Sequence, residues 1–224
     1  MMTFKIKWLL VVTALGVLAG ARLSSSLSAS AGGVWQSNAA ERNNAQSGSG
    51  SSIDSASGQV SLGPPKFFAL AANAAGQIFA GTYASGVIRS TDNGEVWAPV
   101  NTGLTNRSVN CLVVNSSGKL FAGTNGGGVF SSTDQGKNWS PANSGIADAI
   151  VYALVVEPSG HLLAGTHDRG VWRSTNHGQT WRPINAGIRK MLVYALVVNR
   201  PGHLFAGTGS GVFRSTNHGA LWTR

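Results

Sequence analysis

A unit of about 42 residues is repeated four times in this chain. The Gly-Thr pair recurs at that constant spacing, at Gly81-Thr82, Gly123-Thr124, Gly165-Thr166 and Gly207-Thr208. A related octapeptide keeps the same phase and reads STDNGEVW from Ser90, STDQGKNW from Ser132, STNHGQTW from Ser174 and STNHGALW from Ser215. Repeats of about 40 to 45 residues built from short β segments are typical of propeller blades with four strands each. The repeat therefore predicts an all-β fold, a β-propeller of about four four-stranded blades, or an incomplete larger propeller.

The third repeat indicates where the four strands of a blade lie. The apolar run VYALVV at 151–156 predicts a first strand that is covered on both faces. The segments 161–166, 170–174 and 180–184 predict the second, third and fourth strands, separated by polar or glycine-containing turns. Pro183 suits an outermost strand, because an edge can spare the N–H group that proline lacks. The same division fits the other three repeats.

The repeated unit predicts one propeller domain over residues 63–224, with an N-terminal extension. Its repeats span about 63–104, 105–146, 147–188 and 189–224. Residues 22–62 are rich in Ser, Ala and Gly, which predicts a disordered linker because such a segment buries too little apolar surface to offset its ordering entropy. Residues 1–21 combine a basic start, a short apolar run and small residues, the pattern of a signal peptide. We therefore expect export to the periplasm, the medium or the cell surface, with membrane contact only through an uncleaved signal segment.

Charge and cysteine content restrict the classes of partner. The formal net charge is +9, and removing residues 1–21 with their two lysines leaves 15 basic and 8 acidic side chains, a net charge of +7. These basic side chains are scattered and form no run, so we expect no specific nucleic-acid partner. Cys111 is the single cysteine, which excludes an intramolecular disulfide, and its apolar neighbours indicate a small buried side chain.

The octapeptide is interpreted as a structural turn between the third and fourth strands. Asp92 and Asp134 precede a glycine by two residues, where a side-chain oxygen accepts backbone N–H bonds while the glycine takes a positive φ. Asn176 and Asn217 occupy this position in the later repeats, and an amide keeps the acceptor but cannot act as a base. The structural set comprises Ser90, Asp92, Gly94, Trp97, Ser132, Asp134, Gly136, Trp139, Ser174, Asn176, Gly178, Trp181, Ser215, Asn217, Gly219 and Trp222.

The octapeptide resembles the Asp-box, or BNR repeat, whose pattern is S-x-D-x-G-x-x-W. The resemblance extends over about residues 63–224. It implies a family that includes sialidases, xyloglucan-cleaving hydrolases, sortilin-type receptors and photosystem II assembly factor propellers, in which the box itself is a fold element. Three functions follow as hypotheses: an exported, non-catalytic binding or scaffold module, part of a glycoside hydrolase of sialidase or xyloglucanase type, or an assembly factor of the photosystem II type.

Strand order places the variable loops on the face opposite the octapeptide turns. Loops between the second and third strands, and links between blades, share that face, and binding residues commonly lie on such loops. The candidate ligand-binding residues there are Tyr83, Arg107, Asn125, Asp148, His167, Asp168, Arg169, Arg189 and Lys190. We expect a glycan or protein ligand, no cofactor and no metal. His161 and His203, like His177 and His218, are explained by repetition without a metal.

Catalysis is the weaker hypothesis. Glycoside hydrolysis needs two carboxylates roughly 5 to 9.5 Å apart, and Asp148 with Asp168 is the one candidate pair on the loop face. A sialidase resemblance would imply an arginine triad. Arg89, Arg173 and Arg214 occupy the same strand position in three different blades, so we expect them to be solvated and too far apart to converge on one carboxylate.

Ring closure has three solutions on sequence grounds: a tight four-bladed ring, pairing of two chains into a homodimer of eight blades, or further blades beyond this sequence. Ala71 and Ala72 stand where later repeats carry two valines. These small side chains favour close packing of the first blade on the fourth, hence a closed monomer.

Overall fold

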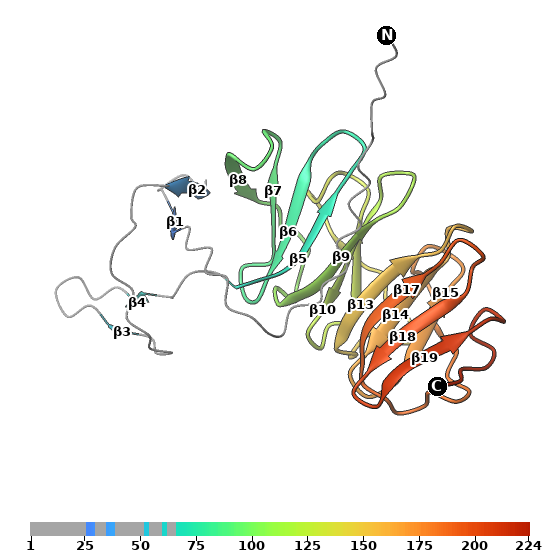
Figure 1. Cartoon of the computed structure of the whole chain (residues 1–224). Coiled ribbons are helices and arrows are strands. Elements are labelled where there is room, and N and C mark those ends of the chain that lie inside the picture. The colour runs from blue at the N-terminus through green and yellow to red at the C-terminus, as the bar shows by residue number, and fades with distance from the viewer. Residues whose placement is uncertain (1–25, 30–34, 39–51, 54–59, 62–65) are drawn as a thin grey trace, which may run out of the picture.

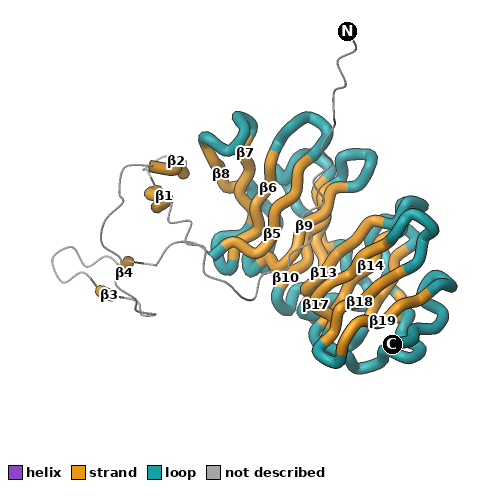
Figure 2. Tube along the Cα trace, in the orientation of Figure 1, coloured by secondary structure: helices purple, strands orange, loops and turns teal. Residues whose placement is uncertain are grey.

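The computed structural model describes residues 66–224 and four short segments, 26–29, 35–38, 52–53 and 60–61. Residues 66–224 contain strands and turns without a helix (Figure 2), which confirms the all-β prediction. Residues 1–21 lie outside the described residues, so the signal peptide stays a prediction. The short segments form β1 (Ser26–Ala29), β2 (Trp35–Asn38), β3 (Ser52–Ile53) and β4 (Val60–Ser61). They lie within 22–62, where the sequence predicts no strand, and β2 pairs with β8 of the first blade.

Four antiparallel sheets follow one another along residues 66–224, one for each repeat (Figure 1). The first contains β5 (Phe67–Ala72), β6 (Ile78–Thr82), β7 (Val87–Ser90) and β8 (Val96–Pro99); the second contains β9 (Val109–Val114), β10 (Leu120–Thr124), β11 (Val129–Ser132) and β12 (Ser140–Pro141). The third contains β13 (Val151–Val156), β14 (Leu162–Thr166), β15 (Val171–Ser174) and β16 (Arg182–Pro183). The fourth contains β17 (Val193–Val198), β18 (Leu204–Thr208) and β19 (Gly211–Ser215), to which Thr223 adds a single bridge at Arg214. The four-strand blade is therefore confirmed, with shorter fourth strands than predicted.

The hydrophobic core is divided into three clusters, each lying between two neighbouring blades. Phe79 and Val87 of the first blade pack with Leu112 and Leu120 of the second, and all four are buried. Equivalent clusters join the second blade to the third and the third to the fourth. The strands β5, β9, β13 and β17 pack on one another in series and so form the inner side of the arc of blades.

The octapeptide turns have the geometry predicted for them. In the second blade the Ser132 hydroxyl donates to Asp134 Oδ1 at 2.8 Å and accepts the Gly136 N–H at 2.9 Å. Asp134 Oδ1 also accepts the backbone N–H of Asn138 at 2.8 Å. Asn176 makes the same two contacts through its amide oxygen, accepting Ser174 Oγ and the backbone N–H of Thr180. The hydrogen bonds are thus independent of the side chain's charge.

The tryptophan of each later octapeptide joins its blade to the preceding one. Trp139 Nε1 donates to Val100 O at 2.8 Å across the first junction. Trp181 donates to Ala142 O and Trp222 to Ile184 O in the same way. Trp97 has no preceding blade among the described residues and donates to Gly94 O of its own turn. Burial follows this difference, because Trp139, Trp181 and Trp222 are buried whereas Trp97 is half-buried.

The arc of blades is not closed, so the prediction of a closed four-bladed monomer is wrong for this structure. In Figure 1 the first and fourth blades stand at opposite ends of the series. Ala71 packs against the core shared with the second blade, and Ala72 is exposed. Successive residues of a strand point to opposite faces. The two alanines therefore could not both serve one new interface.

Candidate functional site

The loops between the second and third strands are held by the threonine of each Gly-Thr pair. In the third blade the Thr166 hydroxyl donates to Gly170 O at 2.9 Å and accepts the Arg169 N–H at 3.1 Å. Thr82 and Thr124 make the corresponding bonds in the first two blades. Gly170 has φ +68°, in the left-handed region that glycine enters without a steric penalty. The repeated pair thus fixes the loop ends while the residues between them vary.

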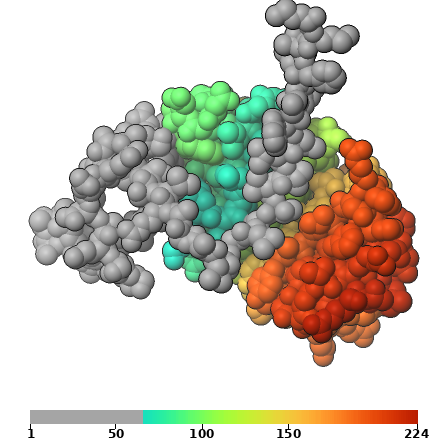
Figure 3. Space-filling view, in the orientation of Figure 1, coloured from blue at the N-terminus to red at the C-terminus, as the bar shows by residue number. Residues whose placement is uncertain are grey.

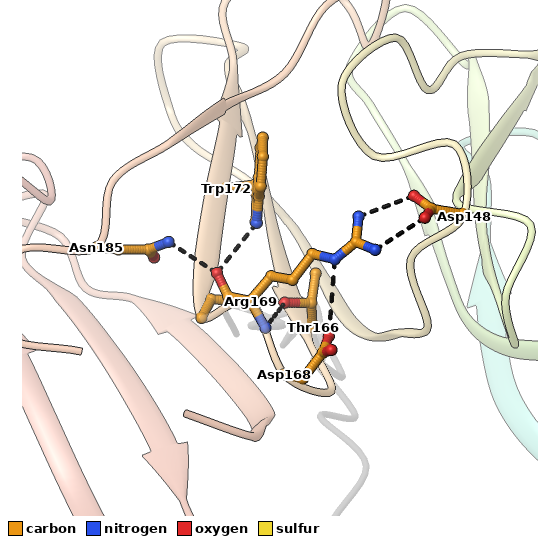
Figure 4. Close-up of polar contacts among 7 residues, drawn as sticks. Asp148, Thr166, Asp168, Arg169, Trp172 and Asn185 are labelled. Carbon is orange, nitrogen blue, oxygen red and sulfur yellow. Dashed lines mark hydrogen bonds and ion pairs between the residues drawn. The ribbon is translucent and has the colours of Figure 1, made fainter. Parts of the chain in front are cut away.

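Arg169 is the centre of a polar cluster on the third of these loops (Figure 4). Its Nη1 and Nη2 atoms donate to Asp148 Oδ1 and Oδ2 at 2.8 and 2.9 Å, a bidentate pair that joins the β14–β15 loop to the link before β13. Arg169 Nε lies 3.8 Å from Asp168 Oδ1. Hydrogen bonds from Arg169 lower the pKa of Asp148 to about 2. Asp148 is therefore ionised at neutral pH and has no proton to donate as a general acid.

The backbone carbonyl of Arg169 orients two further side chains. It accepts Trp172 Nε1–H at 3.1 Å and the Asn185 amide at 2.7 Å (Figure 4). The oxygen of the Asn185 amide in turn accepts the Val171 N–H at 2.6 Å. Because Trp172 is on β15 and Asn185 follows β16, these bonds fix the outer part of the blade relative to the loop.

These residues line an open groove of about 630 Å³ between the outer part of the third blade and the octapeptide turn of the fourth. Its lining comprises Asp168, Arg169, Trp172, Pro183, Ile184, Asn185, Ala186, Arg189, Lys190, Gly219 and Ala220. Arg189 and Lys190 are exposed at its rim, and Lys190 has φ +58°, which is uncommon for a residue with a side chain. Counting Asp148, the groove carries three cations and two carboxylates, so its net charge is positive.

A second group of side chains follows the inner strands. Each first strand has a β-bulge near its start, and the residues left without a partner there are Phe68, Asn110, Tyr152 and Tyr194. The Tyr152 and Tyr194 rings are 5.9 Å apart between centroids, and the His167 ring lies 6.0 Å from Tyr152. Phe68 meets Tyr83 edge to face at 6.0 Å. A bulge re-aims its extra residue, which places these aromatic side chains along the inner side of the arc.

The predicted ligand-binding residues thus fall into different places. The groove brings together Asp168, Arg169, Arg189 and Lys190, and Asp148 pairs with Arg169 beside it. Tyr83 and His167 instead contact the rings on the inner side of the arc. We call this set the inner aromatic row; it comprises Phe68, Tyr83, Tyr152, His167 and Tyr194. Asn125 forms an isolated bridge with Ile150, and Arg107 accepts the Gly86 N–H through its backbone carbonyl.

Sequence reasoning missed Trp172, Asn185, Phe68, Tyr152 and Tyr194. Asn185 has equivalents in Asn101 and Asn143, whose amides also donate to loop carbonyls. Its recurrence at the 42-residue period was an available signal. Tyr152 and Tyr194 also recur at this period, but each lies within a run that reads as an uninterrupted apolar strand, so the repeat did not distinguish them from core residues.

One of the strand-three arginines, Arg173, is less solvated than expected. Arg173 Nη2 lies 2.8 Å from buried Glu157 and 2.8 Å from His161 Nδ1, and the Arg173 side chain is 20% exposed. The solvated reading is therefore wrong for Arg173. Glu157 replaces the asparagine that this turn carries in the other blades and gives the arginine a partner there. Arg89 donates to Gln135 O and Arg173 donates to His218 O, so the two side chains bind different turns and do not converge as an arginine triad would.

The four sheets packed around one axis, with the loops gathered at strand ends, define a β-propeller. Within that class, the DUF6242 beta propeller domain matches residues 54–185, more than half of the chain, so the chain belongs to this family. Among the curated proteins, no sequence matches it.

Many solved structures resemble the chain, and three of them represent different kinds of protein. An ancestral GH74 enzyme is 22% identical with a TM-score of 0.63, and the match covers 71% of this chain and 24% of that one. The extracellular domain of a one-component system from B. thetaiotaomicron is 14% identical with a TM-score of 0.62, covering 74% and 23%. The structure "YCF48 bound to D1 peptide" is 18% identical with a TM-score of 0.56, covering 73% and 55%.

These likenesses show the fold alone. The chain spans about a quarter of the first two structures and about half of the third. Among the residues that the structure describes, no helix is long and apolar enough to span a membrane.

Proposed function

We propose that this protein is an exported, non-catalytic binding module that holds an acidic oligosaccharide in the groove beside Arg169. The observation that carries the proposal is the meeting of Trp172 with Arg169, Arg189 and Lys190 in one preformed groove. Binding sites commonly combine an aromatic wall with a few placed polar groups. An indole face offers a flat apolar surface for a sugar ring, and the rim cations offer partners for its carboxylates.

The outer edge of the third blade favours a glycan over an extended peptide. A peptide that adds a strand to a sheet needs free backbone N–H and C=O groups along that edge. Pro183 lies on β16 and lines the groove, and it has no N–H to offer. Pro141 occupies the equivalent edge position in the second blade, whereas β8 of the first blade, which carries Pro99, pairs with β2 through Trp97 and Val96. The solved structure of YCF48 contains a bound D1 peptide, but the likeness to it concerns the fold.

We propose a non-catalytic role because Asp148, one of the two candidate carboxylates, is engaged in an ion pair with Arg169. Its carboxylate is held by two hydrogen bonds from Arg169, and its pKa of about 2 suits a fixed ion-pair partner rather than a proton donor. The alternative function is that of a glycoside hydrolase related to GH74 enzymes, because solved GH74 enzymes share the fold. That alternative requires a second, protonated carboxyl group to act with Asp168.

We also assign the four octapeptides to the Asp-box class. The support is the shared hydrogen-bond pattern of serine, Asp or Asn, and glycine, and its persistence where Asn replaces Asp. On this assignment the boxes stabilise the blades, and only the fourth box lines the groove, through Gly219 and Ala220.

Binding is tested by isothermal titration calorimetry with tri- to hexagalacturonate, neutral xyloglucan fragments and an oligoglutamate peptide. We expect the galacturonates to bind, and a double variant Arg189→Gln/Lys190→Gln to bind them at least tenfold more weakly. Trp172→Leu should reduce affinity and remove the ligand-dependent change in tryptophan fluorescence.

The matched control is His177→Gln, which changes an exposed octapeptide residue of the third blade that does not line the groove and should leave affinity unaltered. An equal loss from this control and from the double variant would contradict the assigned site. Preferential binding of oligoglutamate would reject the glycan. Release of new reducing ends from xyloglucan would favour the hydrolase.

A further inference from the structure

Each junction between blades is built from the same two faces. We call the side of a blade that packs on the next blade its leading face, and the side that packs on the preceding blade its trailing face. At the junction of the third and fourth blades, Leu163 and Val171 of the leading face meet Leu196 and Leu204 of the trailing face, and all are buried. The 42-residue period allows each residue to be compared with its equivalents in other blades.

The leading face of the fourth blade is uncovered. Val87, Val129 and Val171 are each 0% exposed at the three junctions, whereas the equivalent Val212 is 63% exposed. Val197, which corresponds to half-buried Val155, is 43% exposed. The fourth blade forms the orange to red end of the molecule in Figure 3.

The trailing face of the first blade is uncovered along β5. Leu112, Leu154 and Leu196 are 6%, 6% and 2% exposed, whereas the equivalent Leu70 is 58% exposed. Ile88, further across the same face, is buried, so the exposed part is the inner strand. One chain thus presents an uncovered leading face and an uncovered trailing face, which are the two halves of the interface that it uses three times internally.

A polar contact between neighbouring blades also has an exposed donor at one end of the arc and an exposed acceptor at the other. Arg89 Nη1 donates to Gln135 O at 3.2 Å, and Arg173 Nη1 donates to His218 O at 3.4 Å. In both cases a strand-three arginine reaches the positive-φ residue in the octapeptide turn of the next blade. Arg214 is the equivalent arginine of the fourth blade and is exposed. Asn93, with φ +61°, is the equivalent acceptor in the first blade and is also exposed.

We propose that two copies of this chain associate through these faces, with the leading face of each fourth blade on the trailing face of the other copy's first blade. The two junctions are related by a twofold axis, and together they close two four-bladed arcs into one ring of eight blades. A second copy is the occupant because the same chain carries both complementary faces and the matching arginine and acceptor. Head-to-tail contacts of this kind generate closed rings when the rotation closes. Apolar patches of this extent are rarely left open on a monomer.

The test is sedimentation velocity of the purified protein between roughly 1 and 100 μM, a range that spans micromolar dissociation constants. We expect wild type to sediment with twice the chain mass. Leu70→Asp and Val197→Lys each alter both junctions of a homodimer, so each variant alone should be monomeric, with at least a hundredfold weaker association. Both residues are exposed in the single chain, so the melting temperature measured on the monomer should not fall.

An equimolar mixture of the two variants distinguishes this arrangement from others. The mixed pair has one altered junction and one native junction, because the native leading face of Leu70→Asp meets the native trailing face of Val197→Lys. Mixing should therefore restore a dimer, and only in the mixture. Leu221→Asp is the control, since Leu221 is 51% exposed but its equivalents Asn138 and Thr180 are polar; it should dimerise like wild type.

A wild-type monomer over the whole range would overturn the proposal. A dimer that both variants preserve would overturn it too, because the interface would then lie elsewhere. A mixture that stays monomeric would reject head-to-tail pairing, and open-ended polymers would reject the closed ring.

Discussion

Replacing Trp139 by Phe should destabilise the protein more than the same change at Trp97. Trp139 is 3% exposed, and its indole N–H donates to Val100 O of the preceding blade at 2.8 Å. Phenylalanine keeps an aromatic ring there but has no donor. The Val100 carbonyl then loses this bond in a buried place, which costs about 1–3 kcal/mol.

The smaller ring adds a packing loss. The change from indole to phenyl removes roughly 40 Å³, which at about 24 cal/mol per Å³ of residual cavity is about 1 kcal/mol. The total is about 2–4 kcal/mol. For a folded unit of this size, each kcal/mol shifts the melting temperature by roughly 2–4 °C, so we expect a decrease of roughly 5–15 °C.

Trp97 is the internal control because it has the same place in the repeat but no preceding blade within the part of the chain that the structure describes. Its ring is half-buried, and its N–H donates to Gly94 O of its own turn at 2.9 Å. Water can replace that donor, so Trp97→Phe should cost less than about 1 kcal/mol. Thermal and urea unfolding followed by circular dichroism would measure both losses. Equal losses would refute the view that the inter-blade bond, and not the aromatic ring alone, joins the blades.

Two further predictions concern the octapeptide turn of the second blade. Hydrogen bonds from Asn138 and Ser132 lower the pKa of Asp134 to about 2 from 3.8, so its stabilising effect is present above about pH 4 and is lost as the pH falls towards 2. Asp134→Asn keeps the acceptor oxygen of the turn but loses this charge-dependent effect, which solvent screens at an exposed site, so it should lower the neutral melting temperature only slightly and flatten the acid side of the stability curve; a large loss at pH 7 would contradict this. Gly136→Val should cost more than about 1 kcal/mol, because φ is +84° and an added Cβ would lie 2.9 Å from Val100 Cγ2. Gly118, with φ +80° and no neighbour within 4 Å of an added Cβ, is the comparison site, and urea unfolding of Gly118→Val should show the smaller loss.

The repeat made the fold predictable because it reports the same local rules four times. The segment 151–156 forms β13 with the predicted bounds, and the turn glycines take positive φ where the octapeptide requires it. Pro183 lies on the outermost strand, as its missing N–H demands. Each of these depends on residues close in sequence, so pattern alone decides them.

Features that depend on contacts between blades could not be predicted in this way. The bulge at Tyr152 turns one residue out of a run that reads as uniform, and only pairing with β14 reveals it. Trp172 reads as a core aromatic, but its carbonyl partner at Arg169 turns it into a groove wall. Arg173 is withdrawn from solvent because Glu157 occurs in its own blade and not in the others. Local pattern therefore predicted the fold, whereas contacts between strands and between blades positioned the residues of the site.

Glycan binding and dimer formation can be tested separately, because the groove lies between the third and fourth blades of one chain and the proposed interface joins the fourth blade of one copy to the first blade of the other. The groove lies within one chain, so Leu70→Asp should bind galacturonate like wild type even as a monomer. The inner aromatic row depends on closure instead. Tyr152 and Tyr194 pack at 5.9 Å across a junction, and in the proposed pair Phe68 of the second copy takes the next position after Tyr194. Tyr194 and Phe68, which are 55% and 44% exposed in one chain, would then lie side by side, and the row would cross both junctions of the pair, interrupted only at Asn110 of each copy.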